Sequence, residues 1–420
     1  MKNSTAIMLL FLANTISGIA QGISMISIPW YFSQQEDMTR FGMVYALATL
    51  VALFWVPISG MLVDKYNRKH IFLAITSICG ALVLGIAVWG QMQDILPWWA
   101  VAAVFMITFF NYNIHYPNLY AFAQEITEPS QYGRITSILE IIGQMTSVLA
   151  GAGAAMLLEG TQSGSINLFG VEVAVTFQLE PWLIQDVFLL DGITYVFAFL
   201  IISLIRYTPI SERFPETGSV WKRLQTGWTW LTSHRHIFLF GLFSYVLFAT
   251  ILIEGFYLGA NYVQLFLEGG AGVYAASEMY FALGSLLAGI SIRKVFARMG
   301  SPRSILLLTA LSTIIYLGLT IFKSIPLFYV SLFLVGLSNA GTRIQRVTYL
   351  FKLIPNQVYG RASGIFFLFN ALLRILLVGI FALPLFQNGS TIQYTFGIMA
   401  ILLIFACAGL VYILPKVPKH

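Results

Sequence analysis

The sequence alternates long apolar runs with short polar breaks along its whole length. A transmembrane helix requires about 20 mostly apolar residues, and twelve runs reach approximately this length. They form a group of six, a polar stretch and a second group of six. The predicted spans are 6–32, 41–63, 70–90, 97–122, 134–158, 184–205, 237–266, 272–296, 304–322, 327–350, 362–386 and 392–413.

This pattern predicts an all-α integral membrane protein with twelve transmembrane helices in two six-helix bundles. The first bundle covers 1–206, a cytoplasmic linker covers 207–235, and the second bundle covers 236–420. The first run continues to about Phe32 without a clear cleavage site, which favours a spanning helix over a removed signal peptide.

Composition agrees with a lipid environment. The chain is 58% hydrophobic and 10% charged, whereas soluble domains average about 25% charged residues. Its net charge of +6 is scattered among apolar runs rather than gathered in one patch, so it does not indicate nucleic-acid binding. The two cysteines, Cys79 and Cys407, lie in apolar runs and indicate neither a disulfide framework nor a metal site. We expect no metal and no cofactor.

Basic residues define the orientation, because Lys and Arg are enriched in cytoplasmic loops. With both termini inside, nearly all of the 23 Lys and Arg residues fall on the cytoplasmic side. Only Arg40 and Lys323 are left outside, and Arg374 falls inside a span. The longest outer loop, 159–183, alternates apolar and polar residues over Gly170–Leu179, which fits either a small hairpin or a plain loop.

A short repeat relates the two halves. Pro129-Ser-Gln-Tyr-Gly-Arg134 precedes the fifth span, and Pro355-Asn-Gln-Val-Tyr-Gly-Arg361 precedes the eleventh. The same tripeptide, after a proline, stands at the same topological point of each half. We interpret this as a trace of duplication, common in transporters, which makes the two bundles pseudo-symmetric.

The loop between the second and third spans carries the most specific motif, Gly60-Met-Leu-Val-Asp64-Lys-Tyr-Asn-Arg68-Lys69. A glycine there permits close helix approach, and the aspartate can cap the next helix or pair with a cation. A positive-inside turn is the simpler interpretation. The spacing resembles the Gly-x-Leu-x-Asp-[Arg/Lys]-x-x-Arg-[Arg/Lys] signature of the major facilitator superfamily.

Within that superfamily the chain is most similar to the bacterial exporter branch of macrolide efflux proteins and the enterobactin exporter. The similarity lies in His115-Tyr-Pro117, the two Tyr-Gly-Arg motifs, Asp191 and Ser277-Glu278. Two antiporter features differ: Thr108-Phe-Phe-Asn111 lacks the arginine of many antiporters, and Gly151-Ala-Gly153 replaces their Gly-Pro pair. The resemblance implies secondary transport of a small-molecule substrate across the bacterial inner membrane, by a monomer.

Polar residues recur at helical spacing on four spans, which by the resemblance line the central cavity. They indicate either a solvated path or hydrogen bonding between helices. The first span has Asn14, Ser17, Gln21 and Ser24; the fourth has Thr108, Asn111, His115 and Asn118; the seventh has Glu254, Tyr257, Asn261 and Gln264; the tenth has Asn339, Arg343 and Arg346. His115 is either a titrating group or a neutral hydrogen-bonding residue.

Four carboxylates inside spans are candidates for proton coupling, namely Asp191, Glu254, Glu278 and Glu140. Burial favours the protonated form of a carboxylate, so such a group can load and release a proton near neutral pH. Alternatively, Asp191 and Glu278 are interfacial residues. Arg374 near mid-span requires a partner, either a carboxylate such as Glu140 or Glu254 or an anionic group of the substrate.

We therefore expect a proton-coupled exporter of a bulky amphipathic compound, such as a drug or siderophore. The motif residues Gly60, Asp64, Arg68 and Lys69, together with Arg134 and Arg361, would brace the inward-closed state. An importer or facilitator of a nutrient or metal complex is the alternative. The sequence has no zinc-protease, serine-hydrolase or phosphate-loop motif, which argues against a membrane-embedded enzyme.

Overall fold

The computed structural model describes residues 3–93, 95–161, 165–168, 171–174, 178–208, 220–296 and 299–416. The chain divides into two compact units. The first unit comprises Met1–Glu36 and Val51–Thr217, and the second comprises Asp37–Leu50 and Gly218–His420. Helix α2 (Met38–Lys65) therefore contributes its first half to the second unit and its second half to the first. The predicted boundaries kept 37–50 within the first bundle.

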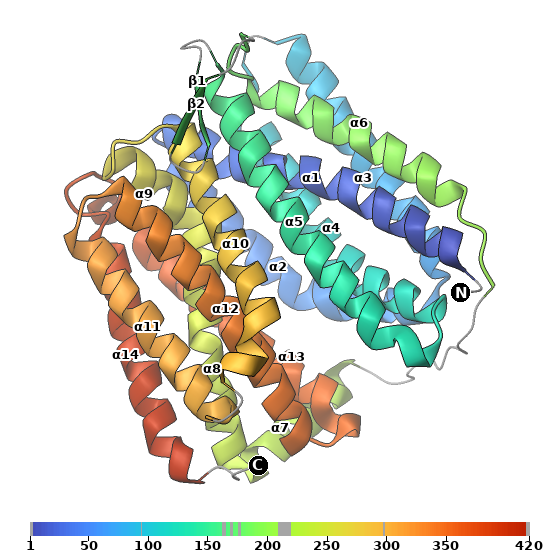
Figure 1. The fold of residues 1–420 in the computed structure, drawn as a ribbon, viewed down its shortest axis with the longest axis vertical. Helices are drawn as coiled ribbons and strands as arrows, with labels where there is room; N and C mark the ends of the chain where they lie inside the picture. Colours follow the sequence, from blue (N-terminus) through green and yellow to red (C-terminus); the bar gives the residue numbers. More distant parts are fainter. Residues whose placement is uncertain are drawn as a thin grey trace. The chain divides into compact units, whose positions relative to one another are not determined.

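The first unit is a helical bundle. In it α1 packs against α5 and α6, and α3 packs against α4 and α6 (Figure 1). Its other elements are α1 (Ser4–Gln34), α3 (Arg68–Gln91), α4 (Trp98–Glu125), the 3₁₀ turn η1 (Pro129–Gln131), α5 (Tyr132–Glu159), β1 (Ser165–Leu168), β2 (Val171–Ala174) and α6 (Ile184–Ser203).

The second unit is also helical, with α12 packed between α10 and α11, and α14 packed on α8 and α11 (Figure 1). Its elements are α7 (Val220–Ser233), α8 (Arg235–Ile253), the π-helical turn η2 (Glu254–Leu258), α9 (Gly259–Leu265), α10 (Ala271–Val295), α11 (Ser301–Ile321), α12 (Ile325–Leu353), α13 (Asn356–Phe381), the 3₁₀ turn η3 (Pro384–Phe386), α14 (Tyr394–Ile413) and the 3₁₀ turn η4 (Leu414–Lys416).

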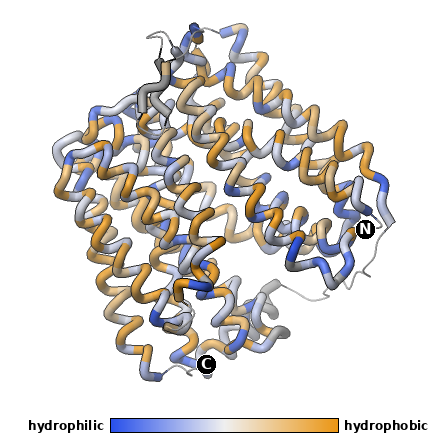
Figure 2. The backbone as a smooth tube through the Cα atoms, viewed as in Figure 1, coloured by the Kyte–Doolittle hydropathy of each residue, from blue (hydrophilic) through white to orange (hydrophobic). Residues whose placement is uncertain are grey.

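The predicted all-α membrane fold is confirmed. Within the described residues, 11 helical segments are long and apolar enough to cross a membrane. Helix α4 is the predicted span outside that set, although its 28 residues are ample in length. The reason is its polar residues, since Asn111, Asn113 and His115 lower the mean hydropathy. Hydrophobic residues follow the helices and polar ones gather near their ends (Figure 2).

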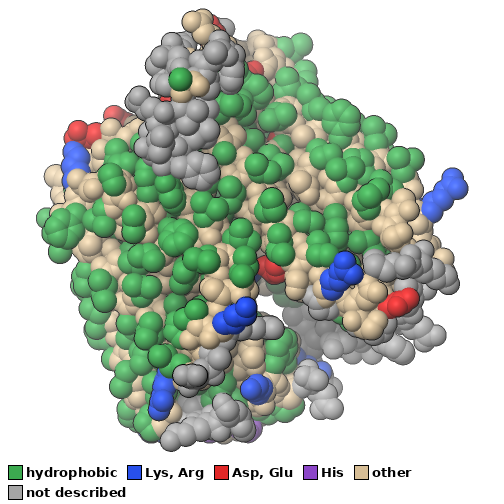
Figure 3. All heavy atoms as spheres, in the orientation of Figure 1, with side chains coloured by type: hydrophobic (Ala, Val, Ile, Leu, Met, Phe, Trp, Pro, Cys, Tyr) green, Lys and Arg blue, Asp and Glu red, His purple; other side chains and the backbone are tan. Residues whose placement is uncertain are grey.

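The surface of the helices is apolar, as lipid contact requires. Phe54, Ile290 and Phe405 are 70%, 67% and 67% exposed. On the face shown in Figure 3, hydrophobic side chains cover the helices, and charged side chains lie mostly near helix ends. Exposed apolar side chains at this density are typical of a membrane protein rather than a soluble one.

Two predicted loops contain regular structure. The outer loop holds an antiparallel hairpin in which Ser165 pairs with Ala174 and Leu168 with Val171. Strand β2 lies in the predicted alternating stretch, but its partner β1 precedes that stretch, and 175–177 lie outside the described residues. The linker contains α7, which buries Leu231 and packs against α8 and α13.

Small residues allow close helix packing inside each unit. In the first unit, the Cβ position of Gly18 would lie 2.9 Å from Thr146 of α5, and Gly22 one turn later faces Ala150. This Gly-x-x-x-Gly spacing is a known helix-packing motif in membranes. The corresponding feature of the second unit is a reciprocal contact of α10 and α12, where Gly284 meets the backbone of Phe333 and Gly336 meets that of Phe281.

Candidate functional site

A buried ion pair holds α3 against α4 in the first unit. Arg68 donates from Nη1 to the Glu125 carboxylate at 3.1 Å and to the Ala121 carbonyl at 2.7 Å. The hydroxyl of Tyr207 donates to the second Glu125 oxygen at 3.3 Å. Glu125 is fully buried, so these bonds compensate the cost of removing its charge from water.

The other residues of the Gly60–Lys69 motif do not all make the contacts predicted for them. The N-terminal cap of α3 is Asn67, whose side-chain oxygen accepts from a backbone N–H at 3.2 Å, and not Asp64. Gly60 faces open space among the described residues, so the expected close approach there is wrong. Lys69 donates to two carbonyls at the C-terminal end of α6, at 2.9 and 2.8 Å. These contacts fix the α2–α3 turn.

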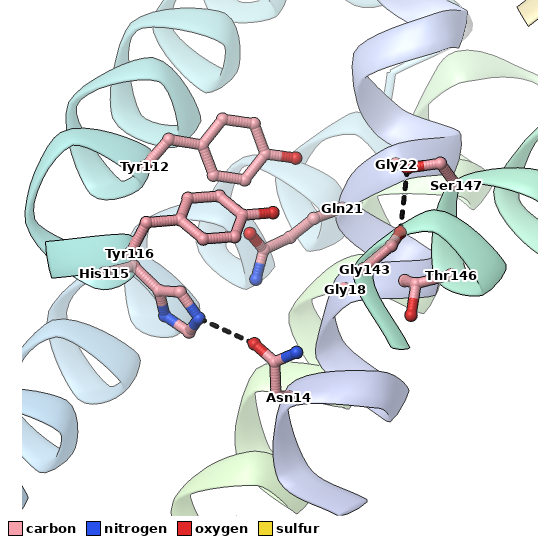
Figure 4. A pocket seen from close by; sticks show the side chains of 10 residues that line it. All are labelled: Asn14, Gly18, Gln21, Gly22, Tyr112, His115, Tyr116, Gly143, Thr146 and Ser147. Carbon is pink, nitrogen blue, oxygen red and sulfur yellow. Dashed lines mark hydrogen bonds between the residues drawn. The ribbon is translucent and has the colours of Figure 1, made fainter. Parts of the chain in front are cut away.

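A polar cavity of about 70 Å³ lies between α1, α4 and α5 (Figure 4). It brings together three residues predicted to line a cavity, Asn14, Gln21 and His115. His115 Nε2 and Asn14 Oδ1 are 3.0 Å apart, which joins α4 to α1. The full lining is Asn14, Gly18, Gln21, Gly22, Tyr112, His115, Tyr116, Gly143, Thr146 and Ser147.

Asn111 lies elsewhere, within the helix packing rather than in this cavity. Its amide donates to the Tyr195 hydroxyl at 3.1 Å, and the residue is 3% exposed. One turn before Tyr195, Asp191 is 0% exposed, and neither of its carboxylate oxygens has a hydrogen-bond partner among the described residues. A buried charge without partners is costly, so this conformation fits a protonated, neutral Asp191.

Glu140 accepts a hydrogen bond from the Tyr120 hydroxyl at 2.8 Å, which joins α5 to α4. It is half-buried. Arg134, two turns earlier on α5, is exposed. Its counterpart Arg361 lies in the first turns of α13, where its backbone contacts Gly227 of α7. The Tyr-Gly-Arg motifs therefore both lie at the N-terminal ends of helices.

Two carboxylates meet in the interior of the second unit. Glu254 is 1% exposed and interacts electrostatically with Glu278 of α10. The Oε1 atom of each is buried without a hydrogen-bond partner among the described residues. The Cβ positions of Gly255 and Gly259 lie 3.9 Å from Glu278 Oε1 and 3.1 Å from Glu254 Oε1. A side chain at position 259 would crowd Glu254, whereas the Cβ position of Gly255 is at ordinary contact distance from Glu278.

Glu254 lies at the start of a π-helical turn, whereas Glu278 lies on α10. The N–H of Gly259 donates to the Glu254 carbonyl five residues earlier, instead of four as in an α-helix. The hydroxyl of Tyr274 donates to the Gly255 carbonyl at 3.1 Å and supports the widened turn. Such single-turn π segments occur frequently at functional sites.

Other predicted cavity residues of this span have structural partners. Gln387 donates to the Tyr257 hydroxyl at 3.2 Å and accepts from the Asn261 amide at 3.1 Å. Tyr257 and Asn261 are 1% and 3% exposed. Gln387 follows η3 and was not predicted, because its 126-residue separation from Asn261 leaves no local signal.

Among the described residues of the second unit, Arg374 contacts a phenol rather than a carboxylate. Its Nη1 donates to the Tyr45 hydroxyl at 3.1 Å, and that hydroxyl donates to the Leu252 carbonyl at 3.3 Å. Arg374 is 3% exposed, and its Nε has no partner among the described residues. Within the second unit, a phenol supplied by the first half of α2 takes the position that the prediction gave to a carboxylate such as Glu254.

The predicted polar residues of α12 differ in how deeply they are buried. Arg343 is exposed and Asn339 is half-buried. Arg346 is 3% exposed, donates to the Ser244 carbonyl at 2.7 Å and lies 3.6 Å from the centre of the Tyr245 ring. This cation–π contact replaces water around the guanidinium. No group of three or more potential metal ligands occurs within the described ranges.

A match to a protein-family model identifies the family of the chain. The model of the Major Facilitator Superfamily matches residues 10–378. The multidrug efflux pump Tap of Mycobacterium tuberculosis is 28% identical over 100 residues, which cover 22% of this chain and 24% of that protein. The same holds for Tap of Mycobacterium bovis. The match spans about a quarter of these curated relatives.

Solved transporters share the fold. The D-xylose–proton symporter has a TM-score of 0.72 at 10% identity over 98% of this chain and 97% of that chain. The nucleoside transporter NupG has a TM-score of 0.71 at 14% identity over 97% and 99%. A bacterial homologue of the iron transporter ferroportin, in an inward-facing state, has a TM-score of 0.70 at 13% identity over 97% and 98%. Together with the family model, these matches show that the chain is a multi-pass membrane transporter of the major facilitator superfamily.

Proposed function

We propose that this transporter is a proton-coupled exporter of bulky amphipathic compounds, drug-like or siderophore-like, in the bacterial cytoplasmic membrane, with both termini in the cytoplasm. The observation that carries the proposal is the acid pair of Glu254 and Glu278. Two carboxylates in one buried place cannot both be charged without a large electrostatic cost. The pair therefore retains a proton while it is closed off from water, and can release that proton when it is hydrated.

This change of charge can couple proton movement to the conformational transition of transport. In alternating access, a site near the bilayer midplane opens to one side at a time. A protonated, neutral acid pair is cheap to bury during the transition, whereas a doubly charged pair is not. The widened turn at Glu254 makes the change local, because Gly255 and Gly259 place no side chain against the carboxylates.

Outward transport of amphipathic compounds is supported by the distant similarity to the multidrug efflux pump. The predicted resemblance to the exporter branch also favours outward transport. The motif residues and the arginines Arg134 and Arg361 are proposed to stabilise the inward-closed state from their places at helix ends. The transporter is proposed to act as a monomer.

Inside-out vesicles test the proposal. Respiration acidifies the lumen, a fluorescent dye follows the pH gradient, and macrolides, a catecholate siderophore and ethidium are added one at a time. In the wild type, at least one compound should dissipate the gradient. Glu254→Gln and Glu278→Gln should each reduce this proton movement about tenfold or more, because the amide cannot exchange a proton.

The matched control is Glu268→Gln in the same unit, since Glu268 pairs at the surface with Lys323 at 2.7 Å. It should retain wild-type coupling. If labelled compounds equilibrate faster than in empty vesicles while the gradient remains intact, the protein is a facilitator and proton antiport is wrong. If proton entry instead drives accumulation of a compound from the outer side, the protein is an importer.

A further inference from the structure

Three tyrosines recur at four-residue spacing on α4, which places Tyr112, Tyr116 and Tyr120 on one helical face. The rings of Tyr112 and Tyr116 have centroids 5.7 Å apart. The Tyr120 hydroxyl ends the series on Glu140, at 2.8 Å. Tyr112 and Tyr120 are half-buried and Tyr116 is 46% exposed, so the row is not a set of rings buried only for their apolar area.

The polar cavity lies along this row. Figure 4 shows the Tyr112 and Tyr116 side chains extending from α4 into the space before Gln21 of α1. Its volume of about 70 Å³ is several times what one water requires, and its lining supplies hydroxyl and amide groups. Gly143, at the wall formed by α5, is one turn from Glu140. The cavity is far too small for a bulky compound, but it suits a chain of hydrogen-bonded water.

Asp191 lies outside the cavity lining, next to the continuation of the polar stripe of α1. Ser24 follows Gln21 by one turn on α1 and lies beside Asp191, although neither side chain forms a hydrogen bond of good geometry with a described residue. Tyr112 directly follows Asn111, whose amide donates at 3.1 Å to the hydroxyl of Tyr195, one turn after Asp191 on α6. A fully buried carboxyl group thus lies at one end of the tyrosine row, and a half-buried one lies at the other.

We propose that Tyr112, Tyr116 and Tyr120, with water in the cavity beside them, form a proton pathway between Asp191 and Glu140. This inference rests on the proton coupling proposed above and assigns that coupling a route in the first unit. The Asp191 carboxylic acid gives its proton to the first hydroxyl or water of the row. Each hydroxyl accepts one proton and donates its own, so no phenol changes charge, and the Glu140 carboxylate receives the last proton.

The other titratable groups around this row are not part of the route. His115 on α4 is engaged with Asn14 and packs edge-on against Phe72 of α3. Cys79 of α3 lies on the Asp191 side, away from the cavity lining. Tyr195 of α6 accepts from the Asn111 amide and does not line the cavity. Among the described residues of α1, Asn14 and Gln21 supply uncharged polar side chains to the cavity lining.

The experiment measures proton exchange at Asp191 directly and needs no transported compound. Full-length protein in lipid nanodiscs is transferred to D₂O, and infrared spectroscopy follows the C=O band of the Asp191 carboxylic acid as it exchanges hydrogen for deuterium. Asp191→Asn identifies the band by its loss. Carbon-13 labelling of aspartate separates it from glutamate bands if that variant fails to fold.

Tyr112→Phe and Tyr116→Phe should each slow this exchange by about tenfold, the factor for one lost hydrogen bond in the route. They keep the ring and hence the packing. Tyr394→Phe, at a 53% exposed site, is the matched control and should exchange at the wild-type rate. Wild-type rates in both row variants, or no exchanging Asp191 band in the wild type, would overturn the pathway. Absence of substrate-driven proton movement in wild-type vesicles would instead overturn the coupling on which it rests.

Discussion

Replacing Gly284 by alanine tests how closely α10 and α12 pack. The added Cβ would collide with the Phe333 carbonyl oxygen and would lie 2.8 Å from its carbon, where ordinary contact begins at 3.4 Å. The helices must therefore separate by at least the 0.6 Å between these values. This also strains the hydrogen bond from Ser285 to the Gly336 carbonyl, at 3.1 Å. Overpacking with partial loss of one hydrogen bond costs about 3 kcal/mol.

The assay is thermal unfolding in detergent, detected with a dye that fluoresces on reaction with an exposed thiol. The chain has two cysteines, both half-buried, with Cys79 in the first unit and Cys407 in the second. In a Cys79→Ser background, Cys407 therefore reports the second unit alone. For a unit of this size, a loss of about 3 kcal/mol lowers the apparent Tm by about 6–12 °C.

The matched control is Gly289→Ala on the same helix. Nothing lies within 4 Å of its Cβ position, and alanine favours helix by up to about 1 kcal/mol relative to glycine. Its Tm should be unchanged or raised. An unchanged Tm for Gly284→Ala, or an equal fall for both variants, would refute the reasoning that backbone contact, rather than glycine itself, makes the position sensitive.

Three further predictions concern buried polar contacts. Arg68→Ala leaves the buried Glu125 carboxylate without its cation and should destabilise the first unit by about 3 kcal/mol, read from Cys79 reactivity on heating. Gln387→Ala removes three hydrogen bonds, with Tyr257 of η2, Asn261 of α9 and the Phe381 carbonyl, and should cost about 1–3 kcal/mol by the same assay at Cys407. Tyr45→Phe removes the hydroxyl that accepts from Arg374 and should cost a similar amount; a Tm equal to wild type would show that this arginine does not depend on that bond.

The helices could be predicted from sequence because every backbone polar group in lipid must be satisfied within its own span. A run of apolar residues therefore determines a helix with little competition from alternatives. The first helix begins at Ser4 where residue 6 was predicted, and the last ends at Ile413 as predicted. The linker helix α7 was missed because it packs against other helices and contains no apolar run long enough to span a membrane.

The sequence predicted which residues of the site share a helix face, but not which residues of different helices contact one another. His115 and Asn14 were placed on polar stripes, but their 3.0 Å contact depends on how α1 and α4 pack. The π turn at Glu254 shifts the residues after it around the helix axis, and no residue type marks such a turn. The role of Tyr45 for Arg374 could not be foreseen either, since 329 residues separate them.

The polar face of α4 has a consequence for how the protein is made. Spans leave the ribosome in chain order, and an unsatisfied amide in hydrocarbon costs several kcal/mol. The Asn118 amide donates to the Arg68 carbonyl of α3, which is synthesised before it. The partner of Asn111, however, is Tyr195 of α6, synthesised 84 residues later. Helix α4 must therefore remain with the insertion machinery or with water until α6 emerges, so that α6 completes the biogenesis of the first unit.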